Sequence, residues 1–136
     1  MYQKYLIVAS KLDKAGTNIT TQMSQFGEDY RFYLVEGEII FDENLDNEKI
    51  NQYDFIIFAS KHQSEKGGKT LSIHAPGNFR DNDFGGEKGK VCKTSALFQK
   101  QFFEKLHDNA KKFNLKDYAI TLECTHHGPL IDKPCL

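Results

Sequence analysis

The feature that most constrains the fold is a set of short, mostly apolar runs, of which residues 53–60 (YDFIIFAS) are the strongest. Residues 5–10 (YLIVAS) have the same character. Runs of this length without alternation are typical of strands buried on both faces, as in parallel sheets covered by helices. Residues 31–35 and 118–122 are further apolar runs, and we expect both to be strands.

Two segments have the periodicity of helices. From Asp13, a natural N-cap, apolar side chains recur every three or four residues up to Phe26, and Gly27 is a natural stop. A longer helix is predicted from about residue 94 to residue 113, with one apolar stripe at spacings of four and three. Ser95 or the threonine before it is the expected cap of this second helix.

The remaining segments are shorter or more polar. Residues 39–41 read as a strand that forms a hairpin or a bulge at Gly37. Residues 42–52 are polar, and a loop or one short helical turn is expected there. Residues 69–78 are predicted to be a strand that runs into a Pro-Gly turn, and residues 79–90 a long loop.

Together these segments predict a single α/β domain over residues 1–136, with a mixed, largely parallel sheet and flanking helices. Residues 130–136 look like the lead-in to another strand. No apolar run approaches the roughly 18 residues that span a bilayer, and no signal-peptide pattern begins the chain. We therefore expect a cytoplasmic protein. The three cysteines, odd in number and without a CxxC, favour reduced thiols over a disulfide framework.

Polar side chains with useful chemistry follow three of the predicted strands. His62 comes after the first of these strands, and His74 ends the second. Residues 123–127 (ECTHH) place a carboxylate, a thiol, a hydroxyl and two imidazoles after the third. Because ligands gather outside the carboxyl ends of parallel strands, we expect these histidines to converge beside the carboxylate. The fifth histidine, His107, falls on the predicted long helix and is expected to be solvated.

Imidazole and carboxylate side chains together suit zinc. Adjacent His126 and His127 should point to opposite sides of a strand, so two interpretations stay open. Either the following Gly-Pro turn re-aims the backbone so that both face one metal, or one binds while the other acts in acid–base chemistry or as an outer partner. Cys124 could be a nucleophile with a neighbouring histidine as base, but its phase with Leu122 favours a buried thiol.

Charge and motifs exclude several other classes of protein. The chain has no GxSxG elbow, P-loop or GxGxxG pattern. A net charge of -1 gives no global sign of nucleic-acid binding. Residues 61–93, however, hold seven bases against four acids. This local excess suggests an anionic partner for the middle of the chain, although a solvated lysine-rich loop would give the same composition.

Three motifs carry a resemblance to a known family. DFIIFASKHQS (residues 54–64), LSIHAPGN (residues 71–78) and ECTHHGP (residues 123–129) occur in that order. Together they resemble the archaeal and plant type of D-aminoacyl-tRNA deacylase. The resemblance implies an α/β/α fold related to phosphorylase-like and peptidyl-tRNA-hydrolase-like architectures. It also implies a zinc-dependent hydrolase that cuts the ester joining a D-amino acid, or a mischarged glycine, to tRNA.

The resemblance further implies a set of site residues. His74, His126 and His127 belong to the implied site, with His62 and Glu123 as companions. The expected zinc ligands are the four histidines His62, His74, His126 and His127. The expected catalytic residues are Glu123, His126 and His127. The expected substrate contacts are Ser60, Lys61, Asn78 and Thr125.

The expected mechanism is metal-assisted ester hydrolysis, in which zinc lowers the pKa of a bound water and Glu123 or a non-ligating histidine moves protons. The tRNA acceptor end would lie along the basic segment, where Lys61, Lys66 and Arg80 can meet phosphates. Members of the family are longer, so we expect this chain to match their N-terminal part and to be truncated after it. The alternatives are another zinc-dependent ester or amide hydrolase and a non-catalytic remnant that binds tRNA or a partner. The oligomeric state is unknown from the sequence.

Overall fold

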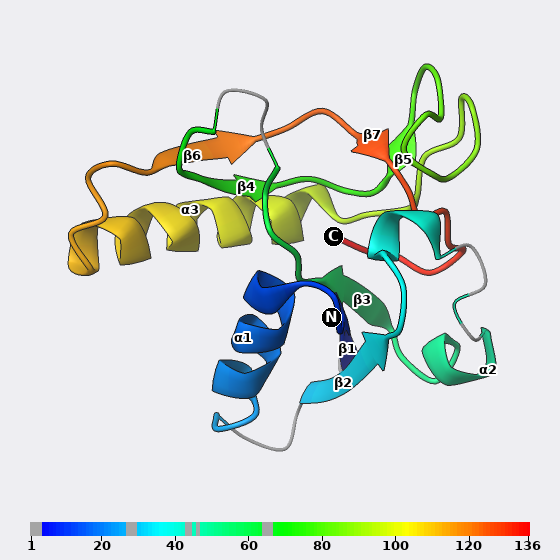
Figure 1. The fold of residues 1–136 in the computed structure, drawn as a ribbon, viewed down its shortest axis with the longest axis horizontal. Helices are drawn as coiled ribbons and strands as arrows, with labels where there is room; N and C mark the ends of the chain where they lie inside the picture. Colours follow the sequence, from blue (N-terminus) through cyan, green and yellow to red (C-terminus); the bar gives the residue numbers. More distant parts are fainter. Residues whose placement is uncertain (1–3, 27–29, 43–44, 46, 64–66) are drawn as a thin grey trace. The chain divides into compact units, whose positions relative to one another are not determined.

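The computed structural model describes residues 4–26, 30–42, 45, 47–63 and 67–136. Their elements alternate between strands and helices, which confirms the predicted α/β class (Figure 1). In chain order they are β1 (Tyr5–Ser10), α1 (Lys14–Met23), β2 (Tyr30–Val35), the 3₁₀ helix η1 (Ile39–Phe41), α2 (Asn47–Ile50), β3 (Phe55–Phe58), β4 (Thr70–Ile73), β5 (Gly77–Asn78), α3 (Ala96–Lys112), β6 (Ala119–Leu122) and β7 (His126–His127).

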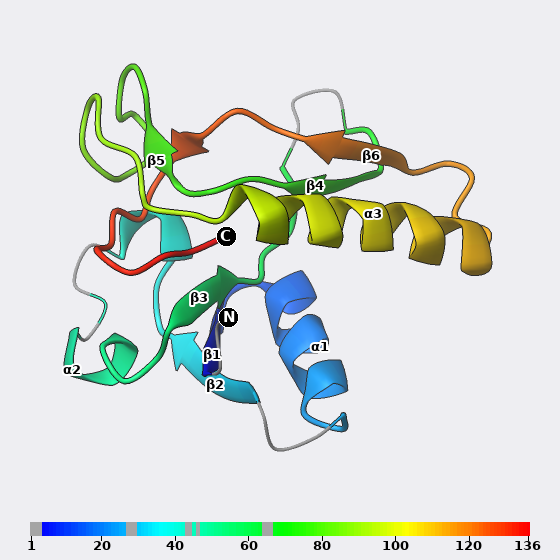
Figure 2. The same ribbon diagram turned by 180° about the vertical axis from the view of Figure 1, so that it is seen from behind.

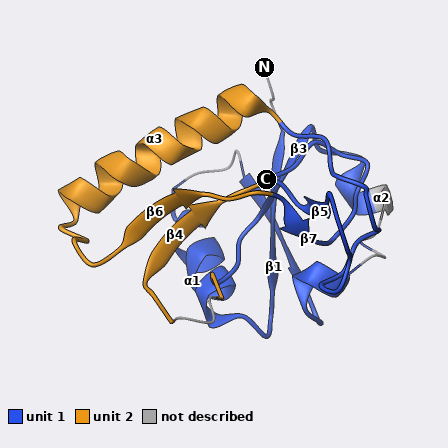
Figure 3. Cartoon of the chain, turned by 90° about the horizontal axis from the view of Figure 1, so that it is seen from above, with its two compact units in different colours: residues 1–61, 75–94, 125–136 blue, residues 62–74, 95–124 orange. Residues whose placement is uncertain are grey.

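The chain divides into two compact units (Figure 3). Unit 1 consists of residues 1–61, 75–94 and 125–136, and unit 2 of residues 62–74 and 95–124. Three of the four points at which the chain passes from one unit to the other therefore fall inside the three sequence motifs. That residues 1–136 form one domain stays a prediction.

Unit 1 is built on a parallel sheet with strand order β2-β1-β3. Five of the six residues of β1 are buried, as its unbroken apolar run predicts. Leu6 and Val8 point into one hydrophobic cluster, and Ile7 and Ala9 into another. Because successive side chains of a strand point to opposite faces, this division shows that both faces of β1 are covered.

The end of the chain lies beside β3. The amide of Ile56 donates to the carbonyl of Pro134 at 2.9 Å, and the amide of Leu136 donates back to the carbonyl of Ile56 at 3.0 Å. Phe58 donates to the Leu136 carbonyl at 2.8 Å. The last residues thus pair in parallel with β3, and the side chain of Cys135 is fully buried there.

Unit 2 is a two-stranded parallel sheet, β4-β6, against which α3 packs (Figures 1 and 2). Ser95 caps α3, since its hydroxyl accepts a hydrogen bond from the amide of Phe98 at 3.2 Å. This confirms the predicted cap and places the helix within two residues of its predicted limits. None of the α3 side chains is buried, and Leu97 is largely exposed.

Some sequence predictions are corrected by the structure. Residues 39–41 form η1 instead of a strand. The amides of Phe41 and Asp42 each donate a hydrogen bond to the carbonyl three residues earlier, which is the pattern of a 3₁₀ helix. The strand predicted over residues 69–78 is interrupted and becomes β4 and β5, which belong to different sheets. The first helix ends at Met23, earlier than expected.

Two further predictions concern residues 42–52 and the membrane. The short helical turn expected within residues 42–52 is α2. Residues 43–44 and 46, like the predicted helix stop Gly27, lie outside the described residues. Within the part of the chain that the structure describes, no helix has the length and apolar character needed to cross a membrane.

Candidate functional site

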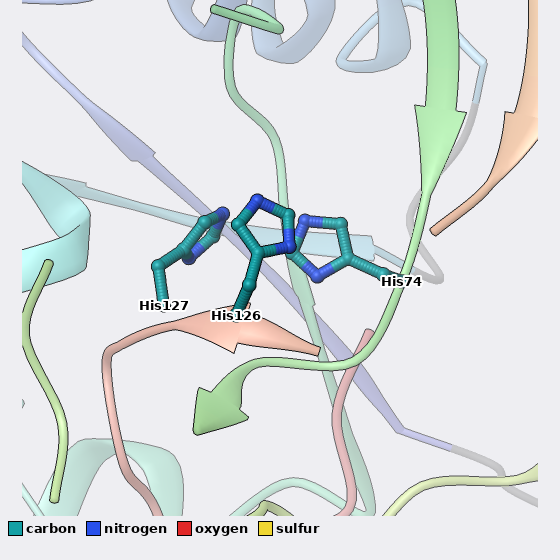
Figure 4. Close-up of side chains that lie close together, drawn as sticks. All are labelled: His74, His126 and His127. Atoms are coloured by element: carbon teal, nitrogen blue, oxygen red, sulfur yellow. The ribbon is translucent and has the colours of Figure 1, made fainter. Parts of the chain in front are cut away.

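Three of the predicted residues, His74, His126 and His127, form a histidine cluster (Figure 4). One potential ligand atom from each ring lies within 4.8 Å of the others. The rings of His126 and His127 are 4.8 Å apart between centroids and nearly perpendicular, at 77°. His74 and His127 are half-buried, and His126 is exposed.

Short strands place the cluster. β7 contains only the two adjacent histidines and pairs antiparallel with β5, with His127 opposite Gly77 and His126 opposite Asn78. His74 precedes Gly77 by three residues and directly follows β4. Both adjacent rings approach His74, so the geometry favours the interpretation in which both face one site.

The backbone next to His127 orients its ring. The Nδ1 atom of His127 lies 2.7 Å from the carbonyl oxygen of Gly128. Because a carbonyl oxygen only accepts hydrogen bonds, Nδ1 carries the hydrogen, and in the neutral ring the lone pair is on Nε2. This arrangement is common for metal-binding histidines, whose second nitrogen donates to a carbonyl or carboxylate.

The Gly-Pro turn after β7 is packed too tightly for a side chain. A Cβ atom at Gly128 would lie 2.3 Å from the carbonyl oxygen of Ile40 and 2.6 Å from the amide nitrogen of Gly86. The Gly128 amide also donates to the carbonyl of Phe84 at 2.9 Å. Sequence reasoning named the turn but missed these partners, because they come from η1, far earlier in the chain, and from the long loop over residues 79–90.

A second group of polar side chains lies within unit 2 and centres on Glu123. The Oε1 atom of Glu123 is 2.9 Å from Nε2 of His62 and accepts a hydrogen bond from Ser72 Oγ at 2.6 Å. Thr121 Oγ1 lies 3.3 Å from the same oxygen and 2.6 Å from Ser72 Oγ. Ser72 and Thr121 were not predicted. The available signal was the spacing of Thr121 on β6 and Glu123 directly after it, because residues two apart in extended backbone share a face.

These neighbours set the charge of Glu123. Partial burial raises the pKa of its carboxyl, and the hydrogen bond from Ser72 and the positive charge of His62 lower it. The hydrogen bond from Thr121 and the charge of His74 lower the pKa further, so it falls below its ordinary value. The carboxyl is therefore an anion at neutral pH. His62 is paired with Glu123 and is not one of the three clustered histidines.

The expected substrate contacts lie at several places. Ser60 and Lys61 are exposed after β3, where the Lys61 amide donates to the carboxylate of Asp13 at 2.6 Å. Thr125 is half-buried just before β7. Asn78 is 1% exposed; its amide group donates to the carbonyl of Gly85 at 2.7 Å, while its Oδ1 has no hydrogen-bond partner among the described residues.

The described cysteines lie outside disulfides, and Cys124 is exposed instead of buried as predicted. It does share its phase with Leu122, yet Leu122 is itself 54% exposed, so this face of the strand is not the covered one. Cys92 and Cys135 are buried. A hydrogen bond from Cys135 lowers the pKa of Cys92 to about 7, against the opposing effect of burial. His107 is exposed on α3, as expected.

The basic segment keeps part of its positive charge uncompensated. Within the described residues, Lys61, Arg80 and Lys93 form no ion pair, and Arg80 lies over the Phe79 ring at 5.3 Å. Lys66 lies outside the described residues. Three other lysines of the segment form exposed ion pairs: Lys69 with Asp117, Lys88 with Asp81, and Lys90 with Glu87.

Comparison with known proteins gives consistent matches over most of the chain. A family model described as D-aminoacyl-tRNA deacylase matches residues 49–136. Proteins named D-aminoacyl-tRNA deacylase from Cenarchaeum symbiosum and Archaeoglobus fulgidus are each 30% identical to the chain, over 96% and 95% of its length. The chain covers 53% and 52% of these two proteins, so it spans about half the length of the curated relatives it matches.

A solved structure is also similar. The crystal structure of a conserved protein of unknown function superposes with a TM-score of 0.88 over 98% of this chain, at 28% sequence identity. The match takes up 53% of that longer chain.

Proposed function

This chain belongs to the D-aminoacyl-tRNA deacylase family, and from that premise we propose that it takes part in hydrolysing the ester bond of D-aminoacyl-tRNA. Mischarged glycyl-tRNA is included as a second substrate. The observation that carries the proposal is the convergence of His74, His126 and His127, which lie in two of the three motifs shared with the family. Such a substrate places the proposed activity in the cytoplasm.

The proposed reaction is a hydrolysis. Water supplies a hydroxyl group to the acyl carbon, the ester C–O bond breaks, and the tRNA oxygen that leaves takes up a proton. The products are a free D-amino acid and a free tRNA. A site for this reaction needs a group that activates water, a group that moves the proton and a surface that binds the tRNA end.

The histidine cluster fits zinc as its activating group. Catalytic zinc sites use three protein ligands and keep one position open, and three imidazoles are one such ligand set. Zn–N bonds are about 2.0–2.1 Å long, and the candidate ligand atoms of the three rings lie within 4.8 Å of one another, which suits one shared ion. The contact of His127 Nδ1 with the Gly128 carbonyl presents Nε2 as its donor atom. When bound, zinc supplies Lewis-acid chemistry, lowering the pKa of water and polarising a carbonyl oxygen.

In this assignment all three clustered histidines hold the metal, and the proton is moved by the pair formed by His62 and Glu123. The ionised Glu123 carboxylate favours a hydrogen on the nitrogen of His62 that it contacts. The charge of His74 also acts on Glu123, which couples the pair to the histidine cluster electrostatically. Glu123 thus supports the acid–base group, while His126 and His127 bind metal.

Basic side chains in unit 1 support tRNA as the proposed partner. Lys61, Arg80 and Lys93 are bases without an ion pair in the described residues, which suits contacts with phosphates. Arg80 beside the exposed Phe79 ring also suits stacking with an unpaired base of the acceptor end. We therefore place the tRNA end along the loop after β5.

Metal content tests the proposal first. Purified chain should bind about one zinc ion, and saturating zinc at 100 times its Kd should stabilise the fold by about 2.7 kcal/mol. The His126→Ala variant should lose both the bound metal and this stabilisation. His107→Ala is the matched control, because His107 is an exposed histidine on α3, outside both polar groups. Zinc that leaves the melting temperature of the wild-type chain unchanged would contradict the assignment.

Deacylation of D- and L-aminoacyl-tRNA, side by side and with or without chelator, tests the substrate. We expect faster hydrolysis of the D-form, abolished by chelator. The His126→Ala loss should exceed the about 10–100-fold that removal of an outer partner costs. Equal rates on both forms would indicate a general ester hydrolase. Binding of tRNA without turnover would indicate a non-catalytic member of the family.

A further inference from the structure

We propose that Ser72 and Thr121 are positioning residues for His62, the acid–base group. They act through the Glu123 carboxylate, which leaves Nδ1 of His62 as the atom that exchanges the proton. This inference rests on the proposed function and deepens it. Neither hydroxyl is expected to touch substrate. Their effect is to hold Oε1 of Glu123 where it fixes the orientation of the His62 ring.

The contacts converge on a single atom. Oε1 of Glu123 accepts from Ser72 at 2.6 Å, lies 3.3 Å from the Thr121 hydroxyl and is 2.9 Å from His62 Nε2. Ser72 and Thr121 are also 2.6 Å apart, so the single hydroxyl hydrogen of Thr121 donates either to the carboxylate or to Ser72, while Ser72 donates to the carboxylate. A carboxylate held in this way cannot rotate without breaking several hydrogen bonds.

The sheet of unit 2 fixes these contacts. Ser72 on β4 and Thr121 on β6 are direct partners in the parallel register, so their side chains leave the sheet on the same face. Glu123 follows Thr121 by two residues and has the same orientation. Its amide donates to the carbonyl of Ile73 at 3.0 Å, which continues the pairing of the two strands. Ser72 and Thr121 therefore lie on paired strands, and Glu123 directly follows β6.

The carboxylate decides which nitrogen of His62 carries the hydrogen. An ionised carboxylate only accepts, so Nε2 must be the donor and, in the neutral ring, Nδ1 is the acceptor. Nδ1 of His62 makes no hydrogen bond to the described residues. The side chain is 24% exposed, which leaves the ring accessible to water.

The proton transfer balances with this assignment. As the oxygen of the attacking water bonds to the acyl carbon, one water proton passes to Nδ1 of His62. The ring then carries hydrogens on both nitrogens, and its positive charge lies next to the Glu123 carboxylate. When the ester C–O bond breaks, Nδ1 gives its proton to the leaving tRNA oxygen. Glu123 remains an anion throughout, the usual role of the carboxylate in such pairs.

Two measurements test the inference, and the first does not depend on activity. In ¹⁵N-histidine NMR spectra of the metal-free chain near neutral pH, His62 should show the Nε2–H tautomer. Ser72→Ala and Thr121→Val, singly and together, should shift His62 toward a mixture of tautomers. Ser72→Thr and Thr121→Ser keep the hydroxyls and should restore the wild-type signal. A wild-type His62 in the Nδ1–H form would overturn the proposal.

The second measurement separates kcat from KM in the zinc-loaded chain. The double variant should lower kcat by about tenfold or more, part of the 10²–10⁴ that a general acid–base group supplies, with KM unchanged. The control is Thr70→Val, which removes a hydroxyl from β4 outside the network and should leave kcat unchanged. Full activity in a correctly folded double variant would overturn the inference. Absence of turnover in the wild-type chain would instead overturn the proposed function, and the NMR result would still decide whether the network orients His62.

Discussion

The charge state of Glu123 depends on the side chains that surround its carboxyl group. Its pKa is lowered in the folded chain, so the unfolded chain binds more protons between the folded pKa and the ordinary value of 4.5. The carboxylate therefore stabilises the fold above this range and loses that contribution as the pH falls through it. We expect Glu123→Gln to lower the free energy of unfolding by about 1–3 kcal/mol at pH 7, and the difference from wild type to shrink below pH 4.5.

Urea unfolding of the metal-free protein across this pH range measures the effect of Glu123→Gln. Glu104→Gln is the control, because Glu104 forms an exposed pair with Lys100 at 3.8 Å on α3. Loss of such a pair costs at most about 1 kcal/mol. A constant difference between wild type and Glu123→Gln from neutral to acid pH would show that the carboxyl is not held as an anion by its neighbours.

Gly128 is a residue for which only the absence of a side chain fits. A Cβ atom would come within 2.3 Å of the Ile40 carbonyl and 2.6 Å of the Gly86 amide, both backbone atoms that cannot rotate away. We expect Gly128→Ala to destabilise the chain by about 2–4 kcal/mol and to weaken zinc binding, since the next residues back are His126 and His127. Gly37→Ala, where no atom lies within 4 Å of the added carbon, should be nearly neutral in thermal unfolding.

At the scale of elements, Asp13 joins a helix to the segment that follows β3. One carboxylate oxygen accepts from the Ala15 amide at 2.9 Å and caps α1, and the other accepts from the Lys61 amide at 2.6 Å. Asp13→Ala removes both bonds, whereas Ser95→Ala removes only the cap of α3. We expect a loss of about 1 kcal/mol for Ser95→Ala and about 2–3 kcal/mol for Asp13→Ala, as measured by urea unfolding.

Asp13→Asn separates the two roles of this side chain. The amide oxygen can still cap α1, but an NH₂ group then faces the Lys61 amide, and two donors oppose each other. The Asn variant should therefore keep the cap of α1 and lose the hydrogen bond from the Lys61 amide. Equal stability of Asp13→Asn and wild type would show that the hydrogen bond from the Lys61 amide contributes nothing to the free energy of unfolding.

Elements with a strong local signal could be predicted from the sequence. Asp13 and Ser95 are caps, and β1 is buried on both faces, because side-chain chemistry and apolar runs act locally. Residues 39–41 could not be predicted, since β-branched residues favour strands while the close approach of Ile40 to Gly85 and Gly128 depends on distant segments. The Ser72 and Thr121 contacts likewise required the strand register, which no single run of residues reveals.

At the scale of the whole molecule, the candidate site draws on residues far apart in sequence. The histidine cluster was predictable because its members come from motifs with a family resemblance. Their convergence, and the pairing of His62 with Glu123 in place of the cluster, depend on how β4, β5, β6 and β7 pair. Sequence patterns identified the chemical groups, and strand pairing divided them into the histidine cluster and the pair of His62 with Glu123.

The two compact units should differ in local stability. In unit 1, β1 is paired on both sides and five of its six residues are buried, whereas α3 in unit 2 has no buried residue. Amides exchange with solvent through openings whose free energy rises with burial and pairing. We therefore expect the slowest amide hydrogen exchange in β1 and clearly faster exchange in α3, measured by mass spectrometry or NMR on the metal-free chain.

Asp13→Ala makes this last prediction sharper, because both hydrogen bonds that it removes lie in unit 1. If β1 exchanges through unfolding of unit 1, its protection should fall by the full stability loss, about 30–150-fold for 2–3 kcal/mol. If the α3 amides exchange through openings confined to α3, their exchange rates in Asp13→Ala should equal those of the wild type. Protection of α3 as high as that of β1, or an equal fall in both, would contradict the prediction that the two units differ in local stability.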